Sequence, residues 1–257
     1  MTLSRRQSLK TLAAAAVLGP GAAVAAEGER AAKQALKLVV LDIGGTLIPD
    51  HGEVPEAMKS AFAHRGIEVS YAEIGDWRGA SKRGMIRHFV ELRTKPDAGR
   101  EALTDAIYQD FSAQADVAYR DVRPIAGVED AMRAMRGDGL LLATTTGFGR
   151  ELNATIFHRL GWGEQFAASI NSDDVVDGRP APFMIFHAME AAHVENVAEI
   201  VVVGDTPLDL QAANNAAVRG VIGVTSGAAT EERLRRERYT HILPSVAELP
   251  ALLRSAF

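Results

Sequence analysis

The sequence predicts an α/β fold built on a parallel sheet, with a helical insertion between its first two strands. Short apolar runs of strand length alternate with segments in which apolar residues recur every three or four positions. This alternation is typical of a parallel sheet covered by helices on both faces. One long segment, residues 52–122, breaks the alternation because it contains no convincing buried strand.

The predicted core elements follow the chain in a regular order. Several of the apolar runs end in Gly, Asp or Thr, and the helical patterns lie between them. The predicted strands cover residues 37–42, 140–145, 166–170, 199–205 and 221–227, and the predicted helices cover 128–137, 151–161, 181–193 and 208–218. Ligands of such sheets bind beyond the carboxyl ends of the strands. Asp42, Thr145, Thr146 and Asp205 are therefore expected to meet at one edge.

The insertion, residues 52–122, begins ten residues after Asp42. Its helical patterns cover residues 54–66, 82–93 and 99–119. A helical segment inserted so close to the end of the first strand is expected to cover the active site as a cap. The core domain then comprises residues 37–51 and 123–257, with residues 123–127 as the return hinge.

Composition limits the classes of function. The 257 residues are 47% apolar and 24% charged, which is ordinary for a globular protein. The formal net charge is -5 and no basic block stands out beyond the N-terminus, so we expect no nucleic-acid partner. The absence of cysteine excludes disulfides, thiolate nucleophiles and Cys-type zinc sites. A homodimer is compatible with the sequence, which does not fix the oligomeric state.

The N-terminal segment, residues 1–26, resembles a twin-arginine export signal. Arg5 and Arg6 precede an apolar stretch of small residues that ends in "AVAA", where cleavage would follow Ala25 or Ala26. A membrane anchor and an ordinary Ala-rich helix are the alternatives, and the short, Gly- and Pro-interrupted stretch weakens the first. We therefore expect a periplasmic protein without stable membrane insertion, or a cytoplasmic one if the signal is not used.

Carboxylates end two of the predicted strands. Asp42 ends the first, Asp205 ends the fourth, and Asp209 follows four residues later. A carboxylate at the end of a buried strand can attack phosphorus and divide one displacement into two steps. Asp209 either orients a water or a neighbouring side chain, or is an ordinary acidic residue near a helix N-terminus.

Two further segments carry groups that bind phosphate. "TTTGFGRE", residues 144–151, places hydroxyls and Gly147 at a strand-to-helix turn, where backbone N–H groups and the helix dipole favour an anion. "GRPAPFM" contains Arg179, whose planar guanidinium suits bidentate phosphoryl oxygens. The alternative is that the threonines only pack in the strand as β-branched residues and that Arg179 lies on the surface.

The segments "DIGGT", "TTTGFGRE", "GRPAPFM" and "GDTPLD", in this order, resemble the four motifs of the haloacid dehalogenase superfamily. Their details resemble its phosphonoacetaldehyde hydrolase (phosphonatase) branch. The resemblance covers essentially all of the chain after the N-terminal segment and implies a Rossmann-like core with an inserted cap. It also implies a nucleophilic Asp42, and Mg²⁺ held by Asp42, the backbone carbonyl of Gly44 and Asp205. Oxygen ligands of this kind suit Mg²⁺.

The same resemblance assigns the phosphoryl group to two side chains. It favours Thr146 as the binding hydroxyl, with Thr145 as a rival one residue away. It places Arg179 where the superfamily more commonly carries Lys, and Arg is the phosphonatase form. Arg179 is therefore expected to neutralise the transferring phosphoryl group.

Gly44 departs from the pattern of most phosphatases in this superfamily, which carry a second Asp two positions after the nucleophile. That Asp protonates the leaving alcohol, a form of help worth about 10² to 10⁴ in rate. Phosphonatases also lack it, because their leaving group is a carbon activated by an imine with a cap lysine.

Lys82 is the candidate for that lysine, because "WRGASKRGMIR", residues 77–87, resembles the phosphonatase cap segment. An imine-forming amine must be partly neutral, and cationic neighbours such as Arg78, Arg83 or Arg87 would lower its pKa if burial adds to their effect. Lys82 is otherwise a clamp for a substrate anion or part of a solvated helix face.

Two departures from the phosphonatase pattern weaken the assignment of a substrate. Met85 stands where phosphonatases carry a His, and Phe148 where they carry a Tyr. Three hypotheses therefore remain open: cleavage of a phosphonoacetaldehyde-type phosphonate, hydrolysis of a small phosphate ester such as phosphoglycolate, and binding of phosphate without turnover.

Overall fold

The computed structural model describes residues 35–257. The expected export signal, residues 1–26, lies outside this range, so it stays a prediction. Among residues 35–257 no helix combines the length and the apolar character that crossing a membrane requires.

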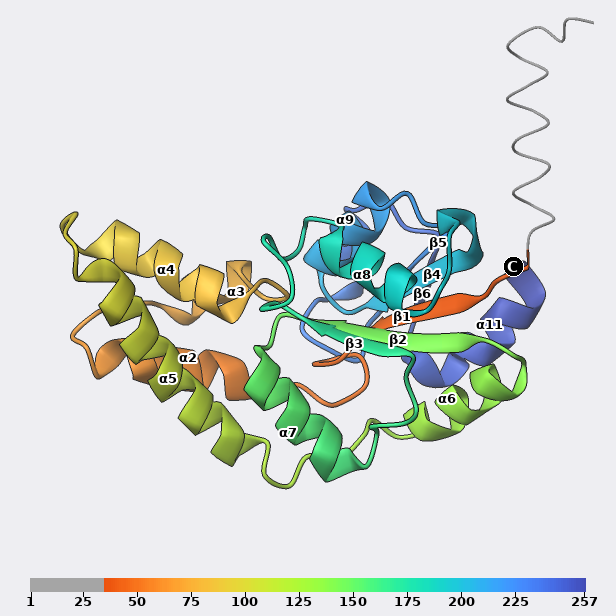
Figure 1. The fold of residues 1–257 in the computed structure, drawn as a ribbon, viewed down its shortest axis with the longest axis horizontal. Coiled ribbons are helices and arrows are strands. Elements are labelled where there is room, and N and C mark those ends of the chain that lie inside the picture. The colour runs from red at the N-terminus through yellow and green to blue at the C-terminus, as the bar shows by residue number, and fades with distance from the viewer. Residues whose placement is uncertain (1–34) are drawn as a thin grey trace, which may run out of the picture. The chain divides into compact units, whose positions relative to one another are not determined.

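The centre of the described part is a six-stranded parallel sheet with the order β3-β2-β1-β4-β5-β6 (Figure 1). The predicted α/β class is confirmed. The apolar patterns indicate five of the six strands, and the sixth is a three-residue edge strand, too short to show a period. The strands are β1 Leu38–Asp42, β2 Leu141–Thr146, β3 Ala168–Asn171, β4 Ile200–Gly204, β5 Gly220–Val224 and β6 His241–Leu243.

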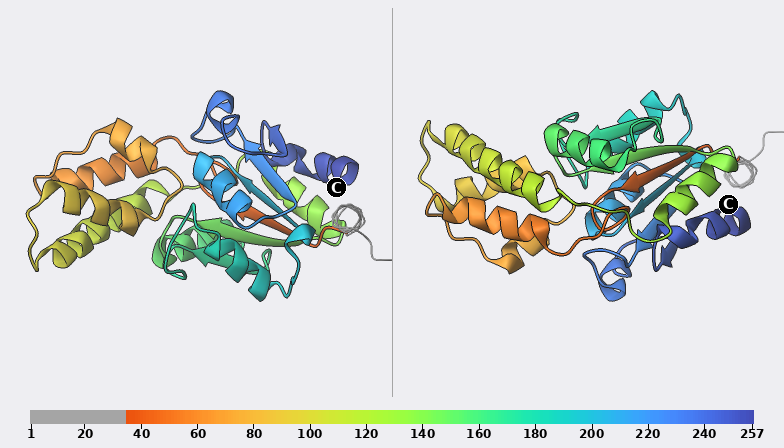
Figure 2. Two further views of the ribbon diagram at one scale, coloured as in Figure 1. Left: turned by 90° about the horizontal axis from the view of Figure 1, so that it is seen from above. Right: turned by 90° about the horizontal axis from the view of Figure 1, so that it is seen from below.

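Helices cover both faces of the sheet (Figure 2). Alternate residues of β1 enter two apolar clusters: Val39 and Leu41 pack with residues of α6, α7 and α11, whereas Leu38 and Val40 pack with residues of α8 and α9. This alternation follows from the two-residue period of a strand. These helices are α6 Val128–Gly137, α7 Arg150–Leu160, α8 Phe183–Ala191, α9 Pro207–Asn215 and α11 Leu249–Ala256, with the short helices α10 Glu231–Leu234, η1 Val197–Glu199 and η2 Val246–Glu248 between them.

The insertion between β1 and β2 is helical, as the sequence predicts, and we refer to its helices α2–α5 as the cap. They pack on one another through apolar side chains such as Phe62, Phe89, Ile107 and Phe111, all nearly inaccessible to solvent. Figures 1 and 2 show them beyond one end of the sheet. Their bounds are α2 Glu53–Ala63, α3 Tyr71–Asp76, α4 Lys82–Arg93 and α5 Arg100–Ala118.

Candidate active site

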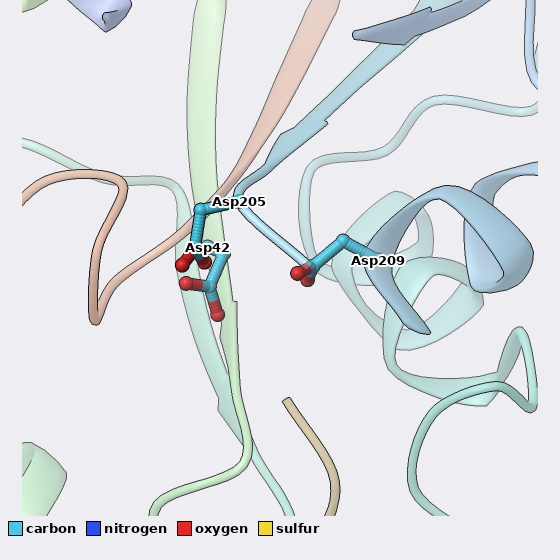
Figure 3. A group of neighbouring side chains, drawn as sticks. All are labelled: Asp42, Asp205 and Asp209. Carbon is cyan, nitrogen blue, oxygen red and sulfur yellow. The ribbon is translucent and has the colours of Figure 1, made fainter. Parts of the chain in front are cut away.

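Three carboxylates meet at the carboxyl end of the central strands (Figure 3). Asp42 is the last residue of β1, Asp205 follows β4 directly, and Asp209 lies in the first turn of α9. Neighbouring parallel strands end at one edge of the sheet, and this brings the side chains together. One oxygen of each carboxylate lies within 4.8 Å of the others.

The start of α9 fixes the orientation of Asp209. Its carboxylate accepts hydrogen bonds from the backbone N–H of Thr206, at 3.0 Å, and from the Thr206 hydroxyl, at 2.5 Å. Pro207 occupies the first turn of the helix, where its missing N–H has no cost. Asp209 is thus held by the helix terminus while its second oxygen faces the cluster.

Arg179 supplies the positive charge of the cluster. Its Nη1 lies 2.7 Å from Oδ1 of Asp42 and 2.7 Å from Oδ1 of Asp209. Its Nη2 donates to the backbone carbonyl of Thr145 at 2.8 Å and to the Thr145 hydroxyl at 2.7 Å. Arg179 is only 6% exposed, so these contacts compensate a buried charge.

Asp205 differs from the other two carboxylates because no ion pair reaches it within residues 35–257. It is 1% exposed and accepts a hydrogen bond from the backbone N–H of Ala228 at 2.6 Å and a longer one, 3.5 Å, from the Thr46 hydroxyl. Burial raises the pKa of Asp205 well above its usual range, and the charges of Asp42 and Asp209 raise it further. Three buried carboxylates thus share one guanidinium, and this excess negative charge fits a divalent cation with oxygen ligands.

Asp42 remains suited to act as a nucleophile. Burial raises its pKa to about 6, even though the Arg179 guanidinium lowers it. The carboxylate is therefore predominantly ionised at neutral pH. An ionised carboxylate oxygen at the end of a strand, beside the Arg179 guanidinium, is chemically able to act as a nucleophile.

A cavity adjoins the carboxylate cluster and extends to the cap. Its volume is about 40 Å³, and residues of the core and the cap both line it. The lining residues from the core include Asp42, Gly44, Thr146, Gly147, Phe148, Arg179 and Asp205, and those from the cap and its connections include Asp50, Arg78, Lys82, Met85 and Tyr119.

The two candidate threonines face different neighbours. Thr146 lines the cavity, and its hydroxyl accepts a hydrogen bond from the backbone N–H of Phe148 at 3.1 Å. Thr145 does not line the cavity, and its hydroxyl is engaged by Arg179. The backbone N–H of Arg150, at the start of α7, donates to the Asp173 carboxylate at 2.8 Å. This part of the anion-binding turn expected in residues 144–151 is therefore already occupied by a carboxylate of the protein.

Phe148 explains how the site is built without a second Asp. A Cβ atom placed on Gly44 would lie 3.4 Å from Cζ of the Phe148 ring, and that ring is 4% exposed. A methyl group would contact the ring at this distance, and we expect a longer acidic side chain to crowd it. The position of the missing carboxylate is therefore covered by an aromatic side chain.

Lys82 enters the same cavity from the cap. It is the first residue of α4, is 5% exposed, and donates from Nζ to the backbone carbonyl of Ala80 at 3.0 Å. Burial lowers the pKa of Lys82 to about 8, although the Asp42 carboxylate acts in the opposite direction. A fraction of this amine is therefore neutral at neutral pH.

The cationic neighbours of Lys82 are only partly those that the sequence suggests. Arg179 and Arg78 contribute to lowering its pKa. Arg83 and Arg87 instead form ion pairs with Glu101 of α5, and Arg83 also pairs with Asp105. The helix turns these two guanidiniums toward α5 instead of the cavity.

The loop before Lys82 contacts the core closely. The backbone N–H of Lys82 donates to the carbonyl of Gly147 at 3.2 Å. A Cβ atom on Gly147 would lie 2.3 Å from the carbonyl oxygen of Ala80, and one on Gly79 would lie 2.4 Å from the Thr206 hydroxyl. Only glycine permits these approaches. They hold the cap loop against the loops that follow β2 and β4.

Three further lining residues come from the cap and its connections, and of these only Arg78 has a signal in the sequence. Asp50 and Arg78, which form an ion pair, come from the connections before α2 and before α4. Tyr119 directly follows α5. Asp50 and Tyr119 stand neither at a strand end nor in a recognised motif, so only the packing of the chain brings them to the cavity.

Comparisons with known proteins agree with this arrangement. A family model of haloacid dehalogenase-like hydrolases matches residues 36–217. A phosphonoacetaldehyde hydrolase of Bacteroides fragilis is 30% identical over 233 residues, which cover 83% of this chain and 84% of that protein. A phosphonoacetaldehyde hydrolase of Paraburkholderia xenovorans is 28% identical over 190 residues, 68% of this chain and 70% of that protein.

Solved structures share the fold at lower identity. A phosphonoacetaldehyde hydrolase-like protein from Oleispira antarctica superimposes with a TM-score of 0.75 at 20% identity, covering 86% of this chain and 92% of that one. A hydrolase from Pseudomonas syringae gives a TM-score of 0.76 at 18% identity, covering 86% and 99%. With the matched family model and the Bacteroides relative, the buried carboxylates and the helical cap belong to a phosphonatase-like enzyme: the chain is a member of the haloacid dehalogenase-like hydrolases.

Proposed function

We propose that the protein cleaves the carbon–phosphorus bond of a small phosphonate of the phosphonoacetaldehyde type in a Mg²⁺-dependent reaction. One observation carries the proposal: the buried amine of Lys82 lines the same cavity as Asp42, where the side chain of Phe148 covers the position of a second acid. A cavity with a nucleophile and an amine, but without the second Asp, suits a carbon leaving group better than an alcohol.

In the proposed reaction, Lys82 and Asp42 act one after the other. The neutral amine of Lys82 condenses with the aldehyde carbon, releases water and forms an imine. The imine takes up a proton. Asp42 then attacks phosphorus; as the new P–O bond forms, the C–P bond breaks and its electron pair passes into the protonated imine, which becomes a neutral enamine. Water then hydrolyses the aspartyl-phosphate, and protonation of the enamine and hydrolysis of the imine return Lys82.

Asp42, the backbone carbonyl of Gly44 and Asp205 would hold the metal. When bound, Mg²⁺ would reduce the repulsion between the Asp42 carboxylate and the phosphoryl oxygens. Arg179 and Thr146 bind the phosphoryl group, with Gly147 at the same turn, and Thr145 holds Arg179. Asp209 positions Arg179 through their ion pair.

The second candidate is hydrolysis of a small phosphate ester. Asp50 favours it, because this carboxylate lines the cavity and could protonate a leaving alcohol in place of the missing Asp. Its ion pair with Arg78 disfavours it, since a guanidinium already engages this carboxylate.

Phosphate release separates these two candidates. Purified protein with Mg²⁺ is offered phosphonoacetaldehyde and a panel of phosphate monoesters that includes phosphoglycolate, and Lys82→Ala is compared with Lys95→Ala, which changes an exposed lysine. We expect phosphonoacetaldehyde to be the best substrate and only Lys82→Ala to abolish its cleavage. Ester turnover that exceeds phosphonate cleavage and survives Lys82→Ala would favour the second candidate.

Export through the twin-arginine route remains a separate proposal. It is supported by Arg5 and Arg6 before an apolar, Ala-rich segment, and the family match begins only at residue 36. Expression of the whole chain should place a shortened protein in the periplasm, and changing both arginines to lysine should prevent this. Full-length protein confined to the cytoplasm in both cases would contradict the proposal.

A further inference from the structure

Tyr119 is a buried polar side chain in the cavity without a partner in the described chain. It directly follows α5, is 3% exposed, and lines the cavity together with Asp42 and Lys82. Its hydroxyl makes no hydrogen bond within residues 35–257 and is not among the fully buried polar atoms that lack a partner, so the oxygen is open to the cavity. A phenol hydroxyl that opens into a small cavity usually finds a hydrogen-bond partner there. The missing partner is therefore to be sought in the cavity.

The ring of Tyr119 lies on the cap side of the nucleophile. It packs edge-on against Phe148, with the ring centroids 5.6 Å apart and an interplanar angle of 66°. Nζ of Lys82 lies 5.6 Å from the centroid of the same Phe148 ring. Tyr119 and Lys82 thus share one aromatic neighbour, while the groups suited to the phosphoryl end, Asp42 and Arg179, come from the core.

The surroundings keep the hydroxyl protonated. Burial raises the pKa of Tyr119, and the carboxylates of Glu53 and Asp50 raise it further. A phenol in this state donates a hydrogen bond but does not act as a base near neutral pH. The ligand oxygen that the Tyr119 hydroxyl contacts must therefore be a hydrogen-bond acceptor.

We propose that Tyr119 is a substrate-binding residue, whose hydroxyl donates a hydrogen bond to an oxygen on the carbon next to the one bonded to phosphorus. This inference rests on the proposed function and assigns a residue to the aldehyde end of its substrate. With the phosphoryl end held by the core, this bond turns the carbonyl carbon toward the Lys82 amine. The contact involves no proton transfer.

Two phosphonates that differ only at this position test the inference. Phosphonoacetate carries a carboxylate where ethylphosphonate carries a methyl group, and neither has an aldehyde that could form an imine. Their dissociation constants are measured by calorimetry in Mg²⁺ with wild type, Tyr119→Phe and Tyr108→Phe. Tyr108 lies on α5 and lines a different pocket, so it is the matched control for removing a phenol hydroxyl.

We expect Tyr119→Phe to weaken phosphonoacetate binding about tenfold, as for a lost hydrogen bond to a charged acceptor, and ethylphosphonate binding less than twofold. Tyr108→Phe should change neither. Equal changes for both ligands, no change for phosphonoacetate, or no binding of either ligand to wild type would overturn the inference. The proposed function fails separately if wild type binds phosphonoacetate but releases no phosphate from phosphonoacetaldehyde.

Discussion

The two sides of the cavity differ in how their polar groups are satisfied. On the core side, Arg179 contacts Asp42, Asp209 and Thr145, and each contact is 2.8 Å or shorter. On the cap side, the Lys82 amine donates to one backbone carbonyl and the Tyr119 hydroxyl has no partner in residues 35–257. Preorganised charges favour stabilisation of a fixed group such as a phosphoryl. In the proposed reaction, the less satisfied groups of the cap side would recognise the rest of the substrate.

The largest expected effect is on the core side. Asp42→Asn removes the nucleophile but retains a side chain of the same size beside Arg179. Phosphate release should fall by about 10⁴-fold or more, as for removal of other nucleophiles. Steady-state phosphate assays measure this, with Asp130→Asn at an exposed ion pair as the control. Residual turnover within tenfold of wild type would contradict the role of Asp42.

Lys82→Arg separates the two roles of the cap lysine. Arginine keeps the positive charge but cannot form an imine at neutral pH. If the Lys82 amine forms an imine with the substrate, the rate of phosphonoacetaldehyde cleavage should fall by about 10³-fold in Lys82→Arg. This loss is comparable to that of an essential catalytic group. A variant that retains most of its activity would instead identify Lys82 as an anion clamp.

Substitutions of Gly44 and Phe148 test whether the Phe148 ring excludes a carboxylate at position 44. Gly44→Asp alone should not create an efficient phosphate-ester hydrolase, because the Phe148 ring covers the space for the carboxylate. Combining it with Phe148→Ala opens that space, and ester turnover should rise by about 10²-fold over the single variant, the lower range for general acid help. Turnover of phosphate monoesters by the two variants and by Phe148→Ala alone measures the gain. Equal ester activity in Gly44→Asp and the double variant would contradict the steric argument.

Substitution of Asp205 tests whether the core side of the cavity is a metal site. Mg²⁺ binding to the folded protein should raise the melting temperature of wild type, since a ligand that binds only the native state stabilises it. Asp205→Asn should weaken the apparent Mg²⁺ affinity by at least about tenfold, because it removes a charged ligand from the cluster. Glu164→Gln, at an exposed position, is the control. A Mg²⁺-dependent shift of the same size in wild type and Asp205→Asn would argue against this site.

The smallest expected effect is the pH dependence of kcat/KM that arises from Lys82 on the cap side. With the pKa of Lys82 near 8, the amine is protonated at lower pH and becomes neutral as the pH rises. The value of kcat/KM for phosphonoacetaldehyde should therefore rise about fivefold from pH 7 to pH 8 and reach a plateau above it. A profile that falls over this interval would contradict the requirement for a neutral amine.

The two sides also differ in what the sequence reveals. The core side follows from strand ends and short motifs, so Asp42, Arg179 and Asp205 are predictable, and the structure brings them together. The choice between Thr145 and Thr146 is not, because neighbouring residues at a strand end differ only in the direction of their side chains. The structure places Thr146 at the cavity and Thr145 at Arg179.

The cap side depends on packing between helices far apart in sequence. The helical periodicity indicates which segments form the cap, but not that Tyr119 at the end of α5 faces Phe148. Arg83 and Arg87 illustrate the same limit: their proximity to Lys82 in sequence suggests an effect on its pKa, yet both pair with α5. Residues i and i+1 of a helix point in different directions, so spacing alone does not place them in a cavity.

Borohydride reduction of the protein during turnover tests the central claim most directly. Phosphonoacetaldehyde, Mg²⁺ and borohydride are added together, and the digested protein is analysed by mass spectrometry. We predict a reduced two-carbon adduct on the peptide that contains Lys82, in wild type and in Lys95→Ala, whereas Lys82→Arg should carry none. Phosphate release without any adduct on Lys82, or an adduct that persists in Lys82→Arg, would contradict the account.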